Sequence, residues 1–161
     1  MKIDIARQPL VPAFMTLFAL AVAAMCAGIP VSDTSGAVRD ALPLLGGQLA
    51  RFQAAYPVWS KFAAGFMLLF TGMCAGRITI RYNLYTVGTC LPIPLYAIVA
   101  CGIATGGNYL AGFAASMLLS LATKNYCRAF CNGYGFDAIF RASLYLGLMP
   151  LIYAPALPLL L

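Results

Sequence analysis

The sequence has no glutamate, no histidine and little charge of either sign. Ten of its 161 residues are lysine or arginine and four are aspartate, so 9% are charged, whereas 63% are hydrophobic. A soluble domain usually has about 25% charged and about 45–50% apolar residues. The chain therefore has too few charged groups to cover a water-facing surface. This composition excludes a disordered chain and a nucleic-acid binder, and it predicts a protein embedded in a bilayer.

The missing residue types also limit the chemistry. Six cysteines are present, but there is no histidine and no paired Cys-x-x-Cys motif to supply the ligands of a structural metal. Cys127 and Cys131 can share a helical face, and either packing or palmitoylation would account for them. Acid–base catalysis usually needs a second acid or a histidine near the first. We therefore predict no metal, no cofactor and no catalytic residue.

Five apolar runs approach the roughly 20 residues that a membrane-spanning helix needs. They cover residues 10–29, 62–76, 86–105, 109–123 and 142–161. We predict an all-α fold, a polytopic transmembrane helix bundle of about five spans, with residues 1–161 forming a single transmembrane domain. The last run ends without a polar flank, from which we expect the natural chain to continue past Leu161.

The first run has a second interpretation. Lys2 and Arg7 precede it and small residues lie near its end, as in a cleaved signal peptide. Its apolar part is longer than the usual core of a signal peptide, which favours an uncleaved span. Cleavage would leave four spans in the same orientation.

The distribution of positive charge predicts the orientation, because cytoplasmic loops carry an excess of lysine and arginine. With the N-terminus inside, the inner segments hold Lys2, Arg7, Arg77, Arg81, Lys124, Arg128 and Arg141. The outer segments then hold only Arg39, Arg51 and Lys61. We predict a multi-pass protein of the inner (plasma) membrane with a cytoplasmic N-terminus. The net charge of +6 also favours contact with anionic head groups.

The outer segment between the first two spans has an apolar pattern. Residues at alternating steps of four and three share one helical face: Val38, Leu42, Leu45, Leu49, Phe52, Tyr56 and Trp59. Pro43 and the Gly46-Gly47 pair should break or bend this helix. We predict a short amphipathic helix on the outer membrane surface, anchored by Tyr56 and Trp59. The alternative is a loop that packs on the spans through the same apolar residues.

Several polar and small residues are candidates for contacts. Arg77 and Arg81 lie four residues apart, and two adjacent guanidinium groups repel each other unless an anion lies between them. Together with Lys124 and Arg128 they are predicted to bind an anionic lipid head group, or to be an ordinary positive flank.

Asp137 and Arg141 have the spacing of an ion pair along a helix. Two GxxxG motifs, Gly72 with Gly76 and Gly102 with Gly106, predict close helix contacts.

Prolines interrupt two of the predicted spans. The third predicted span contains Pro92, Pro94 and Tyr96, and the fifth contains Pro150 and Tyr153. A proline inside a helix removes a backbone hydrogen bond and can kink the helix, and a buried tyrosine hydroxyl needs a partner. These residues predict a cavity between the third and fifth spans.

Residues 81–161 resemble a known family. The similar motifs are Arg81-Tyr82-Asn83-Leu84-Tyr85, Leu91-Pro92-Ile93-Pro94-Leu95-Tyr96, Phe136-Asp137-Ala138-Ile139-Phe140, Leu146-Gly147-Leu148 and Tyr153-Ala154-Pro155. This half of the chain is similar to an uncharacterised family of multi-pass inner-membrane proteins of Bacteroidota. The resemblance implies a membrane bundle and a longer natural chain, and it supplies no catalytic residue.

Three functions are compatible with these features. A non-catalytic subunit or scaffold of the cell envelope, with other membrane subunits or a second copy as partner, fits the lack of a catalytic motif. A small transporter or transporter half fits the prolines and would need a polar cavity within the bilayer. A lipid-modifying enzyme would need Arg77, Arg81 and Asp137 around one lipid phosphate. Membrane lipids are expected partners in each case.

Overall fold

The computed structural model describes residues 10–26, 44–82, 90, 92–103, 109–131 and 135–160. Within these ranges the chain is all-helical, as predicted, and contains no strand. The helices are α1 (Leu10–Cys26), α2 (Leu44–Ala55), α3 (Pro57–Arg81), α4 (Pro92–Ile103), α5 (Tyr109–Cys131), α6 (Phe136–Ile152) and the 3-10 helix η1 (Ala154–Leu160).

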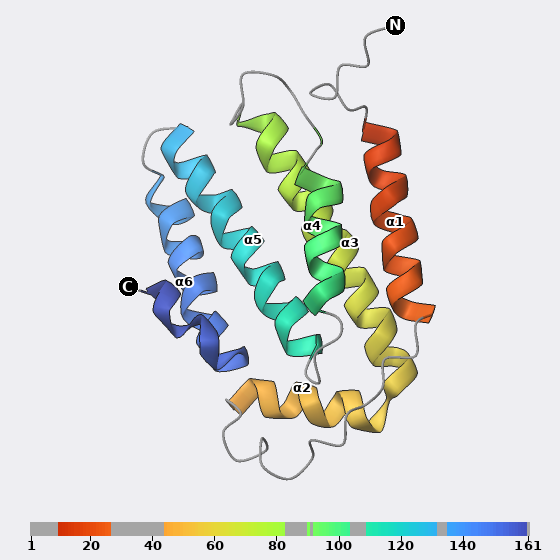
Figure 1. Ribbon diagram of the computed structural model, residues 1–161. Coiled ribbons are helices and arrows are strands. Elements are labelled where there is room, and N and C mark those ends of the chain that lie inside the picture. The colour runs from red at the N-terminus through yellow and green to blue at the C-terminus, as the bar shows by residue number, and fades with distance from the viewer. Residues whose placement is uncertain are drawn as a thin grey trace, which may run out of the picture.

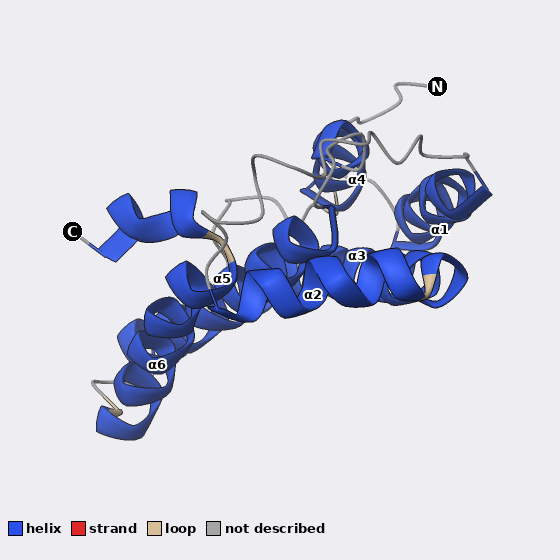
Figure 2. Ribbon diagram, turned by 90° about the horizontal axis from the view of Figure 1, so that it is seen from below, coloured by secondary structure: helices blue, strands red, loops and turns tan. Residues whose placement is uncertain are grey.

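Five of the α-helices run along a common direction, alternately up and down (Figure 1). Viewed from one end, α6, α5, α3 and α1 form a curved row, and α4 lies to one side of it (Figure 2). Each helix of the row contacts its neighbour, and α4 packs on α1, α3 and α5. α2 crosses one end of the row and contacts α3, α5 and α6.

α3 is longer than the predicted run of residues 62–76. It comprises 25 residues and begins at Pro57, at a position where a proline costs no helical hydrogen bond. It ends at Arg81, and the C-cap residue Tyr82 donates its N–H to the Ile78 carbonyl at 3.1 Å. At about 1.5 Å per residue the helix is about 37 Å long. Among the described residues, it is the one helix long and apolar enough to cross a membrane.

The other helices are shorter or less apolar. The described lengths of α1 and α6 are 17 residues each, and that of α4 is 12 residues. A span has about 17–25 residues, so α1 and α6 lie at the lower limit. α5 has 23 residues, but its last two turns carry Lys124, Asn125 and Arg128.

Two glycines of α3 form the contact face that the GxxxG motif predicts. A Cβ atom placed on Gly72 would lie 2.8 Å from Cδ2 of Leu17 in α1, and one on Gly76 would lie 2.5 Å from Cδ1 of Ile93 in α4. Leu17 and Ile93 are both completely buried. Small residues at these two positions therefore allow α1 and α4 to pack directly on α3. Gly106, from the second motif, lies outside the described residues.

Of the break or bend expected at Gly46-Gly47, the break is wrong. α2 begins at Leu44 and runs through the glycine pair to Ala55. Each glycine costs a helix about 1 kcal/mol relative to alanine. Packing of α2 on three other helices offsets this cost, and Gly46 itself is buried. The predicted residues Val38, Leu42 and Pro43 lie outside the described part of the chain.

The run at residues 142–161 is not a single helix. α6 starts earlier, at Phe136, and ends at Ile152, and Tyr153 takes an extended conformation with φ −139° and ψ 99°. η1 then packs back against α6 (Figure 1). Pro155 and Pro158 follow the break, and neither can donate the backbone hydrogen bond that an α-helix would need.

The prolines of α4 do not interrupt it. Pro92 and Pro94 are its first and third residues, where backbone N–H groups have no helical acceptor anyway. Pro150 lies in the last turn of α6. α4 packs on α1, α3 and α5, whereas α6 packs on α5, α2 and η1. α5 therefore lies between the two helices for which a shared cavity is predicted.

Candidate functional site

Positive charge gathers at one end of the bundle. Because the helices alternate in direction, the ends of α3 and α5 and the start of α6 lie together, opposite α2 (Figure 1). The charged residues described at this end are Arg77, Arg81, Lys124, Arg128, Asp137 and Arg141. Those described near α2 are Arg51 and Lys61. The asymmetry makes the first end, called the basic end below, the stronger candidate for an anion site.

A small cavity at the basic end brings three of these cations together. Its volume is about 60 Å³, and it is lined by Cys74, Arg77, Ile78, Arg81, Tyr82 and Lys124. A water molecule needs about 10–15 Å³ of such space, so the cavity holds a few waters or one phosphate-sized group. We call this site the basic cavity.

Two helices supply the cations of the basic cavity. α3 continues to Arg81, which places Arg77 and Arg81 one turn apart on the same face. Lys124 reaches the cavity from α5, which packs along α3. No acid is among the lining residues of this cavity. Guanidinium groups bind phosphate oxygens in pairs, so an anion there would relieve the repulsion between three like charges.

The remaining charged residues predicted for this end lie elsewhere. Arg128, one turn beyond Lys124, is exposed and is not among the residues that line the cavity. The predicted ion pair is present, because Arg141 Nε donates to Asp137 Oδ1 at 3.1 Å. Both side chains are exposed. Asp137 therefore pairs with its own helix and does not line the cavity with Arg77 and Arg81.

The tyrosines of the proline segments have different environments. Ser116 Oγ donates to the Phe113 carbonyl, so the Tyr96 hydroxyl donates to Ser116 Oγ, at 3.3 Å. This bond joins α4 to α5. Tyr153, at the break after α6, is exposed. Pro94 and Pro150 are half-buried on helices that α5 separates. These residues do not come together around a single cavity.

A buried polar pair near α2 is not predicted by the sequence. Ser60 Oγ donates to the Pro57 carbonyl at 2.8 Å and accepts a hydrogen bond from the Tyr109 hydroxyl at 2.6 Å. The pair joins the start of α3 to the start of α5. The two residues are 49 positions apart, and nothing in the local sequence indicates that they meet.

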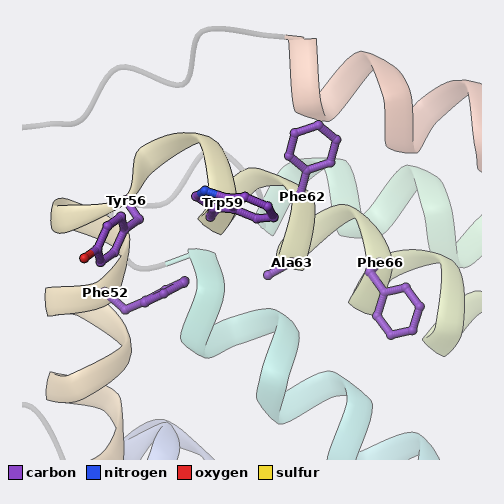
Figure 3. Close-up of a pocket in the computed structure, with 6 residues that line it drawn as sticks. All are labelled: Phe52, Tyr56, Trp59, Phe62, Ala63 and Phe66. Carbon is purple, nitrogen blue, oxygen red and sulfur yellow. The ribbon is translucent and has the colours of Figure 1, made fainter.

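At the end opposite the basic cavity, α2 and α3 form an open groove lined by aromatic side chains. Its volume is about 540 Å³, and it is lined by Phe52, Tyr56, Trp59, Phe62, Ala63 and Phe66 (Figure 3). Two pairs of these rings are in contact, with centroids 5.6 Å apart for Phe52 and Tyr56 and 6.4 Å apart for Trp59 and Phe62. We call this site the aromatic groove. The amphipathic pattern predicts only its first three rings to share a face.

The side of α2 that packs on the bundle is not its most apolar side. Gly46 and Gln53 are buried and Ala50 is half-buried, whereas Leu45 and Phe52 are exposed. Among the described residues of the predicted stripe, Leu49 is the one that packs against the core cluster. The alternative that the whole apolar stripe packs on the helices is therefore wrong for Leu45 and Phe52.

The cysteines at the end of α5 differ in environment. Cys127 is partly buried, and this burial, together with the nearby Cys131 thiol, raises the pKa of Cys127. Cys131 is exposed. Within the described ranges, no three histidine, cysteine or acidic side chains gather as a metal site would require.

A comparison of the chain with family models, curated proteins and solved structures finds no match.

Proposed function

We propose that this protein is a polytopic α-helical protein of the inner membrane that acts as a non-catalytic subunit or scaffold and binds an anionic lipid head group in the basic cavity. The observation that carries the proposal is the meeting of Arg77, Arg81 and Lys124 around one phosphate-sized cavity with no acid in its lining. Such a site holds a phosphate by charge-assisted hydrogen bonds.

The outer surface of the bundle supports a membrane environment. Large apolar side chains are exposed on several helices, among them Met15, Phe18, Phe66, Ile98, Val99 and Phe140. A soluble monomer rarely exposes contiguous apolar patches larger than a few hundred Å². Lipid would cover these faces, with α1, α3, α4, α5 and α6 as the spans and α2 on the outer surface.

The basic end would face the cytoplasm with the N-terminus. Five of the described cations lie at this end, which matches the bias of cytoplasmic segments toward lysine and arginine. Arg77 and Arg81 then lie at the depth of the inner-leaflet phosphates. The anionic lipids of that leaflet attract such a cluster.

The position of Asp137 favours a subunit over a lipid-modifying enzyme. An enzyme of this kind needs an acid or base within reach of the bound phosphate. Asp137 is paired with Arg141 on the exposed side of α6, away from the residues that line the basic cavity. We also infer membership of the Bacteroidota inner-membrane family from the motifs of residues 81–161, although the head-group site does not depend on it.

Lipid retention by the purified protein tests the proposal. The protein in detergent is mixed with equal amounts of phosphatidylglycerol and phosphatidylcholine, and native mass spectrometry counts each lipid that stays bound. We expect preferential retention of phosphatidylglycerol. The double variant Arg77→Gln/Arg81→Gln should lose this preference by tenfold or more, since each charged hydrogen bond contributes about 1.5–3 kcal/mol.

The matched control is Arg51→Gln, which removes an exposed cation at the opposite end. It should retain phosphatidylglycerol as the unaltered protein does. Equal retention of the two lipids, or a double variant that still prefers phosphatidylglycerol, would contradict the proposal.

A further inference from the structure

We propose that the aromatic groove is a binding site for one acyl chain of an outer-leaflet phospholipid. The inference depends on the membrane placement proposed above, but it concerns a different site at the opposite end of the bundle. Its volume of about 540 Å³ lies within the range of about 300–1,000 Å³ that is usual for small-molecule sites.

The orientation of α2 favours an acyl chain in the groove. α2 packs on the bundle through the face that carries Leu49 and the buried Gln53, and this leaves Phe52 exposed at the edge of the groove. Phe66, at the other edge, is 68% exposed. Exposure of five neighbouring aromatic rings to water would be costly, at about 25 cal/mol per Å² of apolar surface. A hydrocarbon chain lying along the rings removes this cost.

The polarity of the groove changes along its length. The Tyr56 hydroxyl and the Trp59 indole nitrogen lie at the end formed by the junction of α2 and α3 (Figure 3). Phe62 and Phe66 lie further along α3 and carry no polar atom. Trp59 and Phe66 are seven residues apart, or about 10 Å along the helix. Tyrosine and tryptophan favour head-group depth, so the lipid would place its ester groups there and its chain over the phenylalanines.

The size of the lining residues excludes a partner helix as the occupant. Where helices of this protein pack on α3, small residues allow the close approach, as at Gly72 with Leu17 and at Gly76 with Ile93. Helix contacts within a bilayer generally use such small residues. Five of the six residues that line the groove are large aromatics and one is Ala63. A flexible chain can follow this uneven surface, whereas a helix cannot approach it closely.

Trp59 allows a direct test, because it is the only tryptophan in the chain. The full-length protein in detergent micelles is titrated with phosphatidylcholine brominated on its acyl chains, and quenching of the Trp59 fluorescence is followed. A bound lipid gives quenching that saturates near one lipid per protein. Bromine near the ester end of the chain should quench more strongly than bromine near the methyl end.

Two variants separate a groove from simple contact with the micelle. Ala63→Leu fills the floor of the groove, and Phe66→Leu removes one ring from an exposed position. Each should weaken lipid binding and so raise the lipid concentration at half-saturation at least severalfold. Quenching is normalised to the starting fluorescence of each variant. Phe140→Leu is the control, because Phe140 is an exposed aromatic on α6 outside the groove. It should titrate like the unaltered protein.

The outcomes distinguish this inference from the membrane proposal. Quenching that rises in proportion to the mole fraction of brominated lipid, and equally in all variants, would overturn the groove while leaving Trp59 in a lipid environment. If acrylamide quenches Trp59 and brominated lipid does not, both the groove and the placement of α2 at the membrane surface would be overturned. The head-group site is tested separately by lipid retention at Arg77 and Arg81.

Discussion

The two halves of α3 differ in which residues they expose and which they pack against other helices. In the first half, the aromatic residues Trp59, Phe62 and Phe66 are exposed and line an open groove with α2. In the second half, Gly72 and Gly76 are buried under side chains of α1 and α4, and the arginines beyond them line a small polar cavity. The aromatic side chains of the first half thus face away from the other helices, and the two glycines of the second half face toward them.

This difference indicates where stability and ligand contact reside. Substitutions at the glycines should act on folding, because they change the distance between helices. Substitutions at the aromatic rings and the arginines should act on lipid contact, because these side chains are exposed. The variants below test this division, beginning with the largest expected effect.

Gly76→Leu should be the most damaging single change. A Cβ at this position would lie 2.5 Å from Cδ1 of Ile93, and because Ile93 is completely buried, the two helices or their side chains must shift within a packed core. Overpacking of a core typically costs about 1–3 kcal/mol, and a leucine adds three further carbons. We expect a clear loss of thermal stability in detergent, measured by circular dichroism. Gly147→Leu in α6 is the control, since no atom lies within 4 Å of a Cβ there. Equal losses for the two variants would contradict the close contact.

Ser60→Ala should have the next largest effect, although it lies in the half of α3 that carries the groove. It removes the acceptor of the buried Tyr109 hydroxyl, and a buried group without a partner costs about 1–3 kcal/mol. Tyr109→Phe should cost less, about 0.5–1.5 kcal/mol, because Ser60 keeps its bond to the Pro57 carbonyl. In the double variant, the loss in free energy of unfolding should be smaller than the sum of the losses in the two single variants. Additive losses would mean that the pair is not coupled.

Lys124→Gln should weaken lipid binding without changing stability. Lys124 lines the basic cavity and Arg128, one turn further along α5, does not. We therefore expect Lys124→Gln to reduce retention of phosphatidylglycerol severalfold and Arg128→Gln to reduce it little. Native mass spectrometry of both variants gives the comparison. If the two reduce retention equally, a diffuse positive surface rather than a cavity binds the lipid.

Asp137→Asn should have the smallest effect. It removes the ion pair with Arg141. The side chain of Arg141 is 59% exposed and that of Asp137 is 73% exposed. Exposed pairs of this spacing contribute about 0.3–0.5 kcal/mol, because water and salt screen them. The thermal midpoint should shift by about 2 °C or less. A larger shift, or a loss of lipid retention, would give Asp137 a role beyond this pair.

The sequence predicts the presence of the helices better than their ends. Hydropathy predicts residues 62–76 as a span because Lys61 and Arg77 bound the apolar run, whereas α3 extends from Pro57 to Arg81. A charged residue still makes the backbone hydrogen bonds of an α-helix, so the helix can continue past the charge. Similarly, glycine propensity predicts a break in α2 that packing on other helices overcomes.

The candidate sites are predictable only where they lie on one helix. The spacing of Arg77 and Arg81 predicts a shared face, and the amphipathic pattern predicts that Phe52 and Tyr56 lie together. Which of Lys124 and Arg128 joins the arginines depends on how α5 packs along α3. The meeting of Phe52 of α2 with the aromatic residues of α3 around one groove likewise depends on the angle between α2 and α3, which no sequence pattern encodes.

The central proposal is that the basic end and the aromatic end lie on opposite sides of a membrane, and cysteine labelling tests it most directly. One variant keeps only Cys131, which is exposed at the basic end, and a second lacks the native cysteines and carries Gln48→Cys on the exposed side of α2. A membrane-impermeant maleimide is applied to sealed, right-side-out membranes. The Gln48→Cys protein should be labelled at once, and Cys131 only after the membrane is permeabilised. Labelling of both positions in sealed membranes, or of Cys131 alone, would contradict the proposal.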